Sequence, residues 1–175
     1  ALSMENKTVA IIQARLTSTR FPKKILEKID NLTLIEFLVK RVKASKKVNH
    51  VIVAIPNNKE NRILKKYFKK IDFFLGSEED VLDRYYKSAK KFNANTIVRI
   101  CGDCPFVDSE IIDKLLLIME NKNYDYVSNT INPTFPDGLD VEVFSFRTLK
   151  EVWKKAKLKN DREHVTPYIL KNDRF

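Results

Sequence analysis

The chain has 175 residues, of which 43% are hydrophobic and 32% are charged, and its formal net charge is +10. This composition is typical of one soluble globular domain that is long enough to bury a hydrophobic core. No apolar run approaches the ~18 residues of a membrane-spanning helix, so the sequence excludes a transmembrane helix and predicts no membrane partner.

Short apolar runs alternate along the chain with segments of helical spacing. Strands are predicted at residues 9–12, 51–55, 73–75, 96–100, 124–127 and 141–144. Helices are predicted at 34–42, from Asn57 or Asn58 to 67, from Ser77 (with Asp80 three residues later) to 92, from Asp108 to 120, and at 145–157. The alternation predicts one α/β domain over residues 1–175, with three layers (α/β/α) and a mostly parallel sheet.

The N-terminal segment contains no apolar region of a secretory signal. We expect Met4 to be the natural start, with residues 1–3 added before it. Two cysteines are too few for a disulfide framework and suit a reducing compartment. We therefore expect a cytoplasmic protein.

The loop after the first predicted strand combines cations with small hydroxyl side chains. Its polar residues are Arg15, Thr17, Ser18, Thr19, Arg20, Lys23 and Lys24. Ligands of open α/β sheets bind at the carboxyl ends of strands, and fixed cations with free backbone N–H groups hold phosphates there. The alternative is a solvated basic loop. The interleaving of cations with hydroxyls and Pro22 favours an anion site.

Most lysines lie in the predicted helices, opposite apolar positions, as on solvated helix faces. A basic nucleic-acid-binding module is the alternative, because basic patches bind polyphosphate backbones. Since the lysines are spread over several helices, we expect no nucleic-acid partner. We expect the excess charge to steer an anionic nucleotide toward the loop.

The three glycines of the chain, Gly76, Gly102 and Gly138, each stand where a strand ends or the chain changes direction. They indicate tight turns or close approach of the backbone to a ligand, with ordinary turns as the alternative. Asp103 follows Gly102 directly after a buried strand. Mg²⁺ is usually bound by one or two carboxylates together with substrate phosphates, so Asp103 is the candidate metal ligand, unless it only closes a turn.

Cys101 and Cys104 form a C-x-x-C pair, which is also found in thioredoxin-like redox sites. In such sites the second cysteine lies at the start of a helix. Here Pro105 and the predicted cap Asp108 delay the helix, and no second cysteine pair completes a zinc site. The pair is interpreted as incidental.

Residues 135–144 combine a turn at Asp137 and Gly138 with an alternating strand. Asp140 and Glu142 are predicted to share one strand face. Carboxylates on such a face accept paired hydrogen bonds from sugar hydroxyls. The alternative is the polar outer face of a half-buried strand.

Residues 13–26 resemble the signature Ala-Arg-x-x-Ser-x-Arg-x-Pro-x-Lys of the sugar-acid cytidylyltransferases, such as CMP-KDO synthetase. The sequence is more similar still to the family of spore coat polysaccharide biosynthesis protein F. The family's strings also match at 102–105 (Gly-Asp-x-Pro), 128–130, 136–144 and 162–168. Two positions depart from the patterns: Lys23 stands where the family usually has Gly, and Cys101 where CMP-KDO synthetase has Gln.

The resemblance implies the nucleotide-diphospho-sugar transferase fold (GT-A, Rossmann-like) and CTP-dependent activation of a sugar or sugar acid for surface polysaccharide. It implies Mg²⁺ on Asp103, with Arg15, Arg20, Lys24 and Asp103 as catalytic residues. The nucleotide-binding residues would be Gln13, Ala14, Arg15, Ser18, Thr19, Arg20, Lys24, Gly76, Ser77 and Gly102. The acceptor-binding residues would be Asp137, Gly138, Asp140, Glu142, Arg162, Glu163 and His164.

Two questions stay open at this point. The wider fold also includes metal-dependent glycosyltransferases that use a nucleotide-sugar donor, and this is the alternative activity. The cytidylyltransferases have a second metal-binding Asp near their C-terminus, for which this chain shows no equivalent before Phe175. Either Asp137 or Asp140 replaces it, or the site has one ligand fewer, or the natural chain continues.

Residues 129–140 are too long and too polar for a simple strand connection, and loops of this length are usually functional. Phe135 stands between Pro133 and Pro136, which limit the entropy lost on docking. The resemblance implies a homodimer. We expect this segment to project and pack on a two-fold mate or on a further C-terminal part, with an exposed loop as the alternative.

Overall fold

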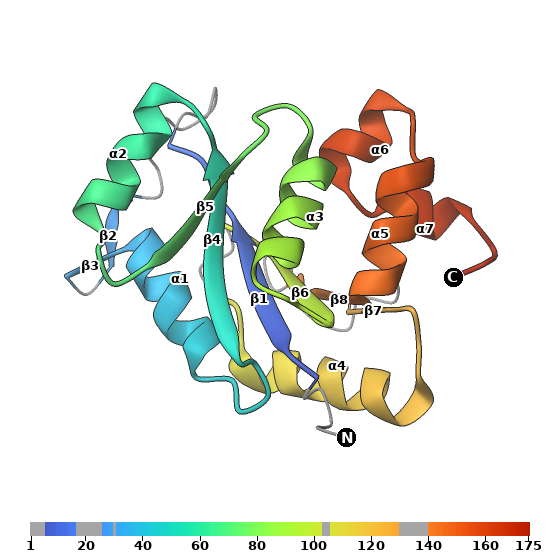
Figure 1. Ribbon diagram of the computed structural model, residues 1–175. Coiled ribbons are helices and arrows are strands. Elements are labelled where there is room, and N and C mark those ends of the chain that lie inside the picture. The colour runs from blue at the N-terminus through green and yellow to red at the C-terminus, as the bar shows by residue number, and fades with distance from the viewer. Residues whose placement is uncertain (1–5, 17–25, 30, 103–105, 130–139) are drawn as a thin grey trace, which may run out of the picture.

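A central sheet with helices on both faces forms the protein (Figure 1). The computed structural model describes residues 6–16, 26–29, 31–102, 106–129 and 140–175. Within these residues the sheet has six strands in the order β5-β4-β1-β6-β8-β7. Their bounds are β1 (Thr8–Gln13), β4 (His50–Pro56), β5 (Asp72–Gly76), β6 (Thr96–Cys101), β7 (Tyr126–Ser128) and β8 (Glu142–Ser145).

The first four strands in this order are parallel, and β8 runs antiparallel to both of its neighbours. The predicted mostly parallel sheet is therefore confirmed. Its carboxyl edge is formed by the ends of β1, β4, β5 and β6. Because β8 is reversed, its first residue, Glu142, pairs with Arg99 near that same edge.

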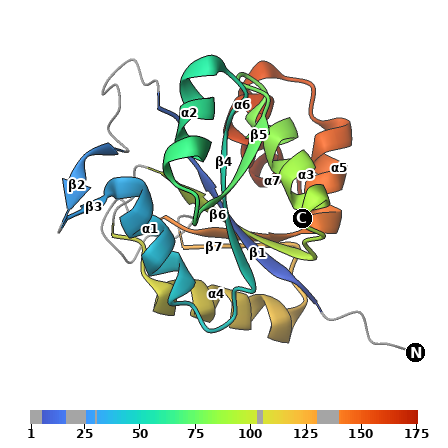
Figure 2. The ribbon, with the colours of Figure 1, turned by 60° about the vertical axis from the view of Figure 1, so that its left-hand side comes forward.

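Two sets of helices cover the sheet (Figure 2). One face is covered by α1 (Leu34–Lys43), α2 (Lys59–Tyr67) and α4 (Ser109–Lys122). The other is covered by α3 (Val81–Lys91), α5 (Phe146–Lys155), α6 (Lys159–His164) and α7 (Pro167–Lys171). None of the helices in the described ranges is long and apolar enough to cross a membrane.

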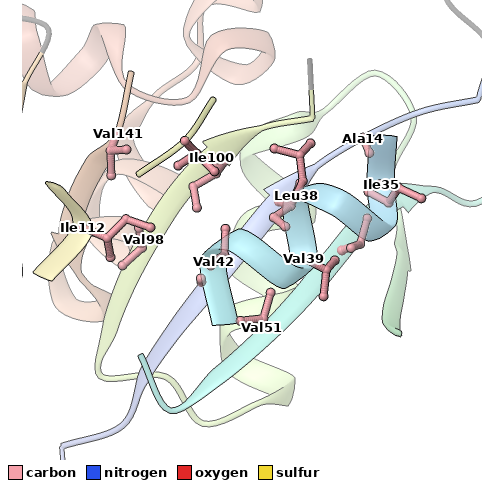
Figure 3. Close-up of a cluster of buried hydrophobic side chains, with 14 of the residues drawn as sticks. Ala14, Ile35, Leu38, Val39, Val42, Val51, Val98, Ile100, Ile112 and Val141 are labelled. Carbon is pink, nitrogen blue, oxygen red and sulfur yellow. The ribbon is translucent and has the colours of Figure 1, made fainter. Parts of the chain in front are cut away.

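Alternate residues of the central strands feed two hydrophobic cores, one on each face, as the period of two in a strand requires. Ala10 and Ile12 of β1 pack toward α1, whereas Val9 and Ile11 pack toward α3. Figure 3 shows the first core, where Leu38 of α1 lies over the strands. Both faces of β1 are thus fully buried, which explains its unbroken apolar sequence.

Polar side chains fix where the helices begin. Asn58 and Asp108 cap α2 and α4 as predicted, and Ser145 caps α5. The prediction that Ser77 caps α3 is wrong. The N-cap is Asp80, whose carboxylate accepts a hydrogen bond from Asp83 N, while Ser77 Oγ accepts one from Asp80 N at 3.1 Å. Two successive capping patterns overlap here, and the second begins the helix.

Several short elements were not predicted from the sequence. The hairpin of β2 (Lys28–Ile29) and β3 (Leu32–Thr33) turns at Asn31, which has a φ of 66°. Helices α6 and α7 have six and five residues, too few to show a helical period. Asp140, predicted as a strand residue, precedes β8 and is exposed.

Gly102 fixes how closely β6 approaches the end of β1. Its N–H donates to the Gln13 carbonyl at 2.7 Å. A Cβ at this position would lie 2.6 Å from that carbonyl oxygen and 3.0 Å from Ala14 Cβ. Only glycine therefore permits this closure at the carboxyl edge.

We expect Gly102→Ala to lower the free energy of unfolding by about 1–3 kcal/mol, because the added methyl meets backbone that cannot move aside. Urea denaturation measures the change. The control is Ser109→Ala at the first position of α4, for which we expect a change within about 0.5 kcal/mol. Equal stability of Gly102→Ala and the parent protein would contradict the close approach.

Candidate active site

The loop that follows β1 is held at two points on either side of Arg15. Ala14 N donates to the Ala54 carbonyl of β4 at 3.1 Å. Leu16 N donates to Asn61 Oδ1 of α2 at 2.7 Å. Ala14 and Leu16 are buried, whereas Arg15 is exposed. The sequence thus presents one arginine to solvent from a fixed piece of backbone at the carboxyl edge.

Asn61 is the residue that makes this anchoring possible, and the sequence analysis missed it. Its side chain is fully buried, and its Nδ2 donates to Asn58 Oδ1 at 2.7 Å. Asn58 in turn caps α2. The start of α2 therefore clamps the β1 loop. The signal in the sequence was an asparagine one turn after a capping asparagine, on the inward side of an otherwise polar helix.

The end of β6 lies beside the same loop. Cys101 pairs in register with Gln13, and Gly102 follows. The remaining predicted residues of this edge, Ser18, Thr19, Arg20, Lys24, Asp103, Asp137 and Gly138, lie outside the described residues, as do Cys104 and Phe135. In the described part of the chain, no three His, Cys, Asp or Glu residues gather as a metal-binding group.

The turn between β5 and α3 is built over a buried arginine. Arg84 is 2% exposed, and its guanidinium donates to the carbonyls of Ser77 (2.8 Å) and Glu78 (3.0 Å). A Cβ on Gly76 would lie 2.6 Å from Arg84 Cγ, which explains this glycine. Gly76 and Ser77, predicted on the nucleotide side, are thus at the carboxyl edge as expected. Arg84 was not predicted.

Burial lowers the pKa of the Arg84 guanidinium, Tyr85 and Glu78 act in the opposite direction, and the positive charge of Arg15 lowers it further. Arg15 and Arg84 both belong to the segments at the carboxyl edge, and their like charges oppose each other there. Two arginines that repel each other at the ligand edge favour the binding of an anion between or beside them.

A row of polar side chains crosses the sheet near this edge. Arg99 of β6 donates from Nη2 to Gln13 Oε1 (3.1 Å) and forms an ion pair from Nη1 to Glu142 Oε1 (2.6 Å). Tyr126 of β7 donates its hydroxyl to the other oxygen of Glu142. Arg99 also lies over the Tyr85 ring, with 5.5 Å from its Cζ to the centroid. The row joins β1, β6, β8 and β7.

The environment of this row keeps its tyrosines neutral. Burial, followed by the charge of Glu142, raises the pKa of Tyr126. Burial also raises the pKa of Tyr85. Both carboxylate oxygens of Glu142 are already bound, one by Arg99 of β6 and the other by Tyr126 of β7, so this side chain links the strands. Its predicted role toward sugar hydroxyls stays a prediction.

The predicted acceptor residues of α6 differ in their surroundings. Arg162 binds the carboxylate of Asp80 through Nε and Nη2 and donates from Nη1 to the Trp153 carbonyl at 2.6 Å. It thereby ties α5 and α6 to the start of α3. Glu163 and His164 are exposed.

Val165, next to His164, has a φ of 70°, which is rare and strained for a β-branched residue. Thr166 N donates to the His164 carbonyl at 2.8 Å across it, closing a three-residue turn. Val165 is also buried. Strain of this kind persists only where packing enforces it and is often found at functional sites.

A mostly parallel sheet of this order, with an anchored Ala14–Leu16 segment after its first strand, defines a Rossmann-like α/β domain whose ligand edge is the carboxyl edge. The family model described as "Cytidylyltransferase" matches residues 9–175. The chain therefore belongs to the cytidylyltransferase family, and the resemblance stated from the sequence is confirmed.

Its relatives agree. The chain is 44% identical to the uncharacterized protein MJ1063 of Methanocaldococcus jannaschii, over 95% of this chain and 68% of that protein. It is 34% identical to the spore coat polysaccharide biosynthesis protein SpsF of Bacillus subtilis, over 94% and 70%. It is 32% identical to the 3-deoxy-manno-octulosonate cytidylyltransferase of Rickettsia akari, over 73% and 54%. The chain thus spans about half the length of this last relative.

Solved structures show the same fold. A cytidylyltransferase from Leptospira borgpetersenii superposes with a TM-score of 0.89 at 33% identity, over 95% of this chain and 71% of that one. A CMP:2-keto-3-deoxy-manno-octonic acid synthetase complexed with CTP superposes with a TM-score of 0.71 at 16% identity, over 93% and 84%. The second likeness shows the fold alone. The predicted nucleotide-sugar transferase fold is confirmed.

We expect Arg99→Met to lower the free energy of unfolding by about 3–5 kcal/mol, because it leaves the half-buried Glu142 carboxylate without its cation. Glu142→Gln should restore much of this loss when combined with Arg99→Met, since the double variant has no unpaired charge. Denaturation of both single variants and the double variant gives the coupling energy. Strictly additive changes would show that the pair is not coupled.

Proposed function

We propose that this protein transfers the cytidylyl group of CTP to a hydroxyl of a sugar or sugar acid and releases pyrophosphate. The observation that most supports this is the β1 loop, fixed by Ala54 and Asn61, which presents Arg15 at the carboxyl edge. The named activity of the Rickettsia relative supports CTP and a sugar acid as substrates. The name of SpsF supports a place in surface polysaccharide synthesis.

In the proposed reaction the acceptor hydroxyl attacks the α-phosphorus of CTP. A new P–O bond forms, the bond to the β-phosphate oxygen breaks, pyrophosphate leaves, and the hydroxyl proton passes to solvent or base. Arg15, Arg20 and Lys24 would stabilise the charge that develops on the phosphate oxygens. Such electrostatic stabilisation is usually the largest catalytic contribution at sites of this kind.

Mg²⁺ is proposed as the cofactor, with Asp103 as its protein ligand. Gly102, the preceding residue, is held against β1 by its bond to the Gln13 carbonyl. A single carboxylate fits Mg²⁺, which keeps several waters and takes further oxygens from substrate phosphates. When bound, the ion would neutralise charge on the phosphates.

The acceptor is proposed to bind beyond β6, toward Asp140, Glu163 and His164. Glu163 and His164 are exposed and stand directly before the strained turn at Val165, which supports a functional role for them. Arg162 would contribute by holding α6 against Asp80. Asp137 and Gly138 stay in the proposal on the resemblance alone.

We expect the protein to release pyrophosphate from CTP when a suitable sugar acid is present, in an assay that compares all four nucleoside triphosphates. Arg15→Ala and Asp103→Asn should each lower kcat/KM by at least ~10²-fold, the effect of removing one electrostatic stabiliser. Lys150→Ala, an exposed substitution on α5, is the control with unchanged turnover.

Near-normal turnover in Arg15→Ala or Asp103→Asn would contradict this assignment of the site. Tight binding of a nucleotide diphosphate sugar, with no pyrophosphate from any triphosphate, would instead support a glycosyltransferase. Calorimetric titration with CTP and with CDP- and UDP-sugars separates the two activities.

We also propose that the protein is a homodimer, with residues 129–140 at the interface. Asn129 Oδ1 accepts a hydrogen bond from Val141 N at 2.9 Å, so the two ends of this segment are joined. Long loops whose ends lie close together are often compact surface units with a function of their own. Phe135 would be its apolar anchor.

Sedimentation analysis over a concentration series should give twice the 20.5 kDa mass of the chain. Phe135→Ala should shift this equilibrium toward the monomer, because it removes the anchor. Leu158→Ala, which truncates another exposed apolar side chain, should leave it unchanged. A monomer at every concentration in the parent protein would remove the dimer proposal.

A further inference from the structure

Arg84 is a buried cation at this edge, and the described part of the chain provides no anion to pair with it. It is 2% exposed, on the first turns of α3, and its two hydrogen bonds go to the neutral carbonyls of Ser77 and Glu78. Within the described ranges, no carboxylate forms an ion pair with it. The neighbouring Glu78 is exposed.

Other poorly exposed arginines of the same half of the molecule are paired. Arg99 binds the Glu142 carboxylate, and Arg162 binds the Asp80 carboxylate. Buried charges in proteins are normally paired with an opposite charge, because loss of water costs several kcal/mol that dipoles only partly offset. Arg84 departs from this rule although it is the most deeply buried of the three.

The charge of Arg15 adds to the need for an anion at this edge. Burial lowers the pKa of Arg84, and the positive charge of Arg15 acts in the same direction. The backbone on either side of Arg15 is held by Ala54 and Asn61, so this arginine projects from a fixed point of the same edge. An anion bound at Arg15 would remove this repulsion and stabilise both guanidinium groups.

We propose that Arg84 is a further arginine of the triphosphate site, in addition to Arg15 and Arg20, and that it strengthens the binding of a ligand in proportion to the ligand's negative charge. The inference rests on the proposed function, since it assigns the anion to the triphosphate of the nucleotide. Arg84 lies beneath the β5–α3 turn and would attract the triphosphate through its charge, without touching it. The bound anion would in turn offset the repulsion between Arg84 and Arg15. It is a positioning and affinity residue.

The structure offers a different explanation, in which Arg84 only holds the Ser77 and Glu78 carbonyls and so shapes the turn. Charge and shape are separable by substitution. Arg84→Lys keeps the charge, whereas Arg84→Gln removes it but keeps a hydrogen-bond donor for the turn. Arg84→Met is a second neutral variant, because apolar replacements of buried charges are often tolerated.

The test is calorimetric titration of each variant with inorganic tripolyphosphate, CTP and cytidine. The parent protein should bind CTP more tightly than cytidine. Arg84→Gln and Arg84→Met should lower the affinity for CTP and tripolyphosphate about tenfold, the size of one charge–charge interaction across roughly 12 Å at an effective dielectric constant of about 20. Their affinity for cytidine, and the CTP affinity of Arg84→Lys, should change less than about threefold.

The control is Arg147→Met, which makes the same change in net charge on an exposed residue at the start of α5, away from the carboxyl edge. It should leave all three affinities unchanged. Equal losses for cytidine and CTP, in the lysine and the neutral variants alike, would show that Arg84 only shapes the turn. Failure of both neutral variants to fold would show that the charge is already compensated, and would also overturn the proposal.

The outcome is distinguishable from failure of the proposed function. If no triphosphate yields pyrophosphate with any acceptor, but the charge-dependent pattern of binding holds, the nucleotidyl transfer is wrong and the role of Arg84 stands. If pyrophosphate is released, and Arg84→Gln and Arg84→Met bind tripolyphosphate as tightly as the parent protein, the transfer stands and the role of Arg84 is wrong.

Discussion

The placement of β1 between β4 and β6 is the constraint on which the rest of the structure depends. Val9, Ala10, Ile11 and Ile12 are fully buried, and both edges of the strand are paired in register. Its position therefore has almost no freedom. The Gly102 N–H bond to the Gln13 carbonyl and the Ala14 bond to β4 extend this order one residue beyond the strand. The backbone position of the exposed Arg15 is therefore fixed by the fully buried strand that precedes it.

Rigid support of this kind continues outward through side chains. Asn58 and Asn61 hold the loop from α2, and Arg84 holds the β5–α3 turn from below. Arg99 connects Gln13 to Glu142, so that the two sides of the edge are mechanically joined through one guanidinium. Polar residues that specify a site in this way must all be satisfied together, since each unpaired member would be costly in a buried setting.

The sequence was sufficient to predict the fold, because strand and helix periods are local signals. The runs at 51–55 and 96–100 became β4 and β6, and Asp108 begins α4 as its capping chemistry required. The prediction that Ser77 caps α3 was wrong because Asp80, three residues later, also has a side-chain oxygen that can cap a helix. Helices α6 and α7 are too short for a period, and tertiary packing of Ile169 and Val165 stabilises them instead.

The site was predictable only where its residues follow a strand in the sequence. Gln13, Gly76 and Gly102 lie at strand ends in the sequence, and the structure places all three at the carboxyl edge, while their part in binding stays a prediction. Asn61, Arg84 and Arg99 act across 45, 7 and 43 positions of the chain, on Leu16, Ser77 and Glu142. No local pattern records such a partner. The only sign of such a residue in the sequence is a polar side chain on the buried side of a helix or strand. This sign does not indicate which residue it binds.

The reversal of β8 makes the ligand edge electrically uneven. Helices α2 and α3 begin at the carboxyl edge, so the positive ends of their dipoles face it. The chain enters α5 from the opposite edge, so α5 runs back and its C-terminal carbonyl groups lie toward α6. There Arg162 donates hydrogen bonds to the carbonyls of Trp153 and Ala156. The helix dipoles therefore place their positive ends above the parallel strands and a carbonyl end beside β8. The two sides of this edge therefore differ in charge, so that a ligand with one highly charged end and one hydroxylated end would bind in one orientation.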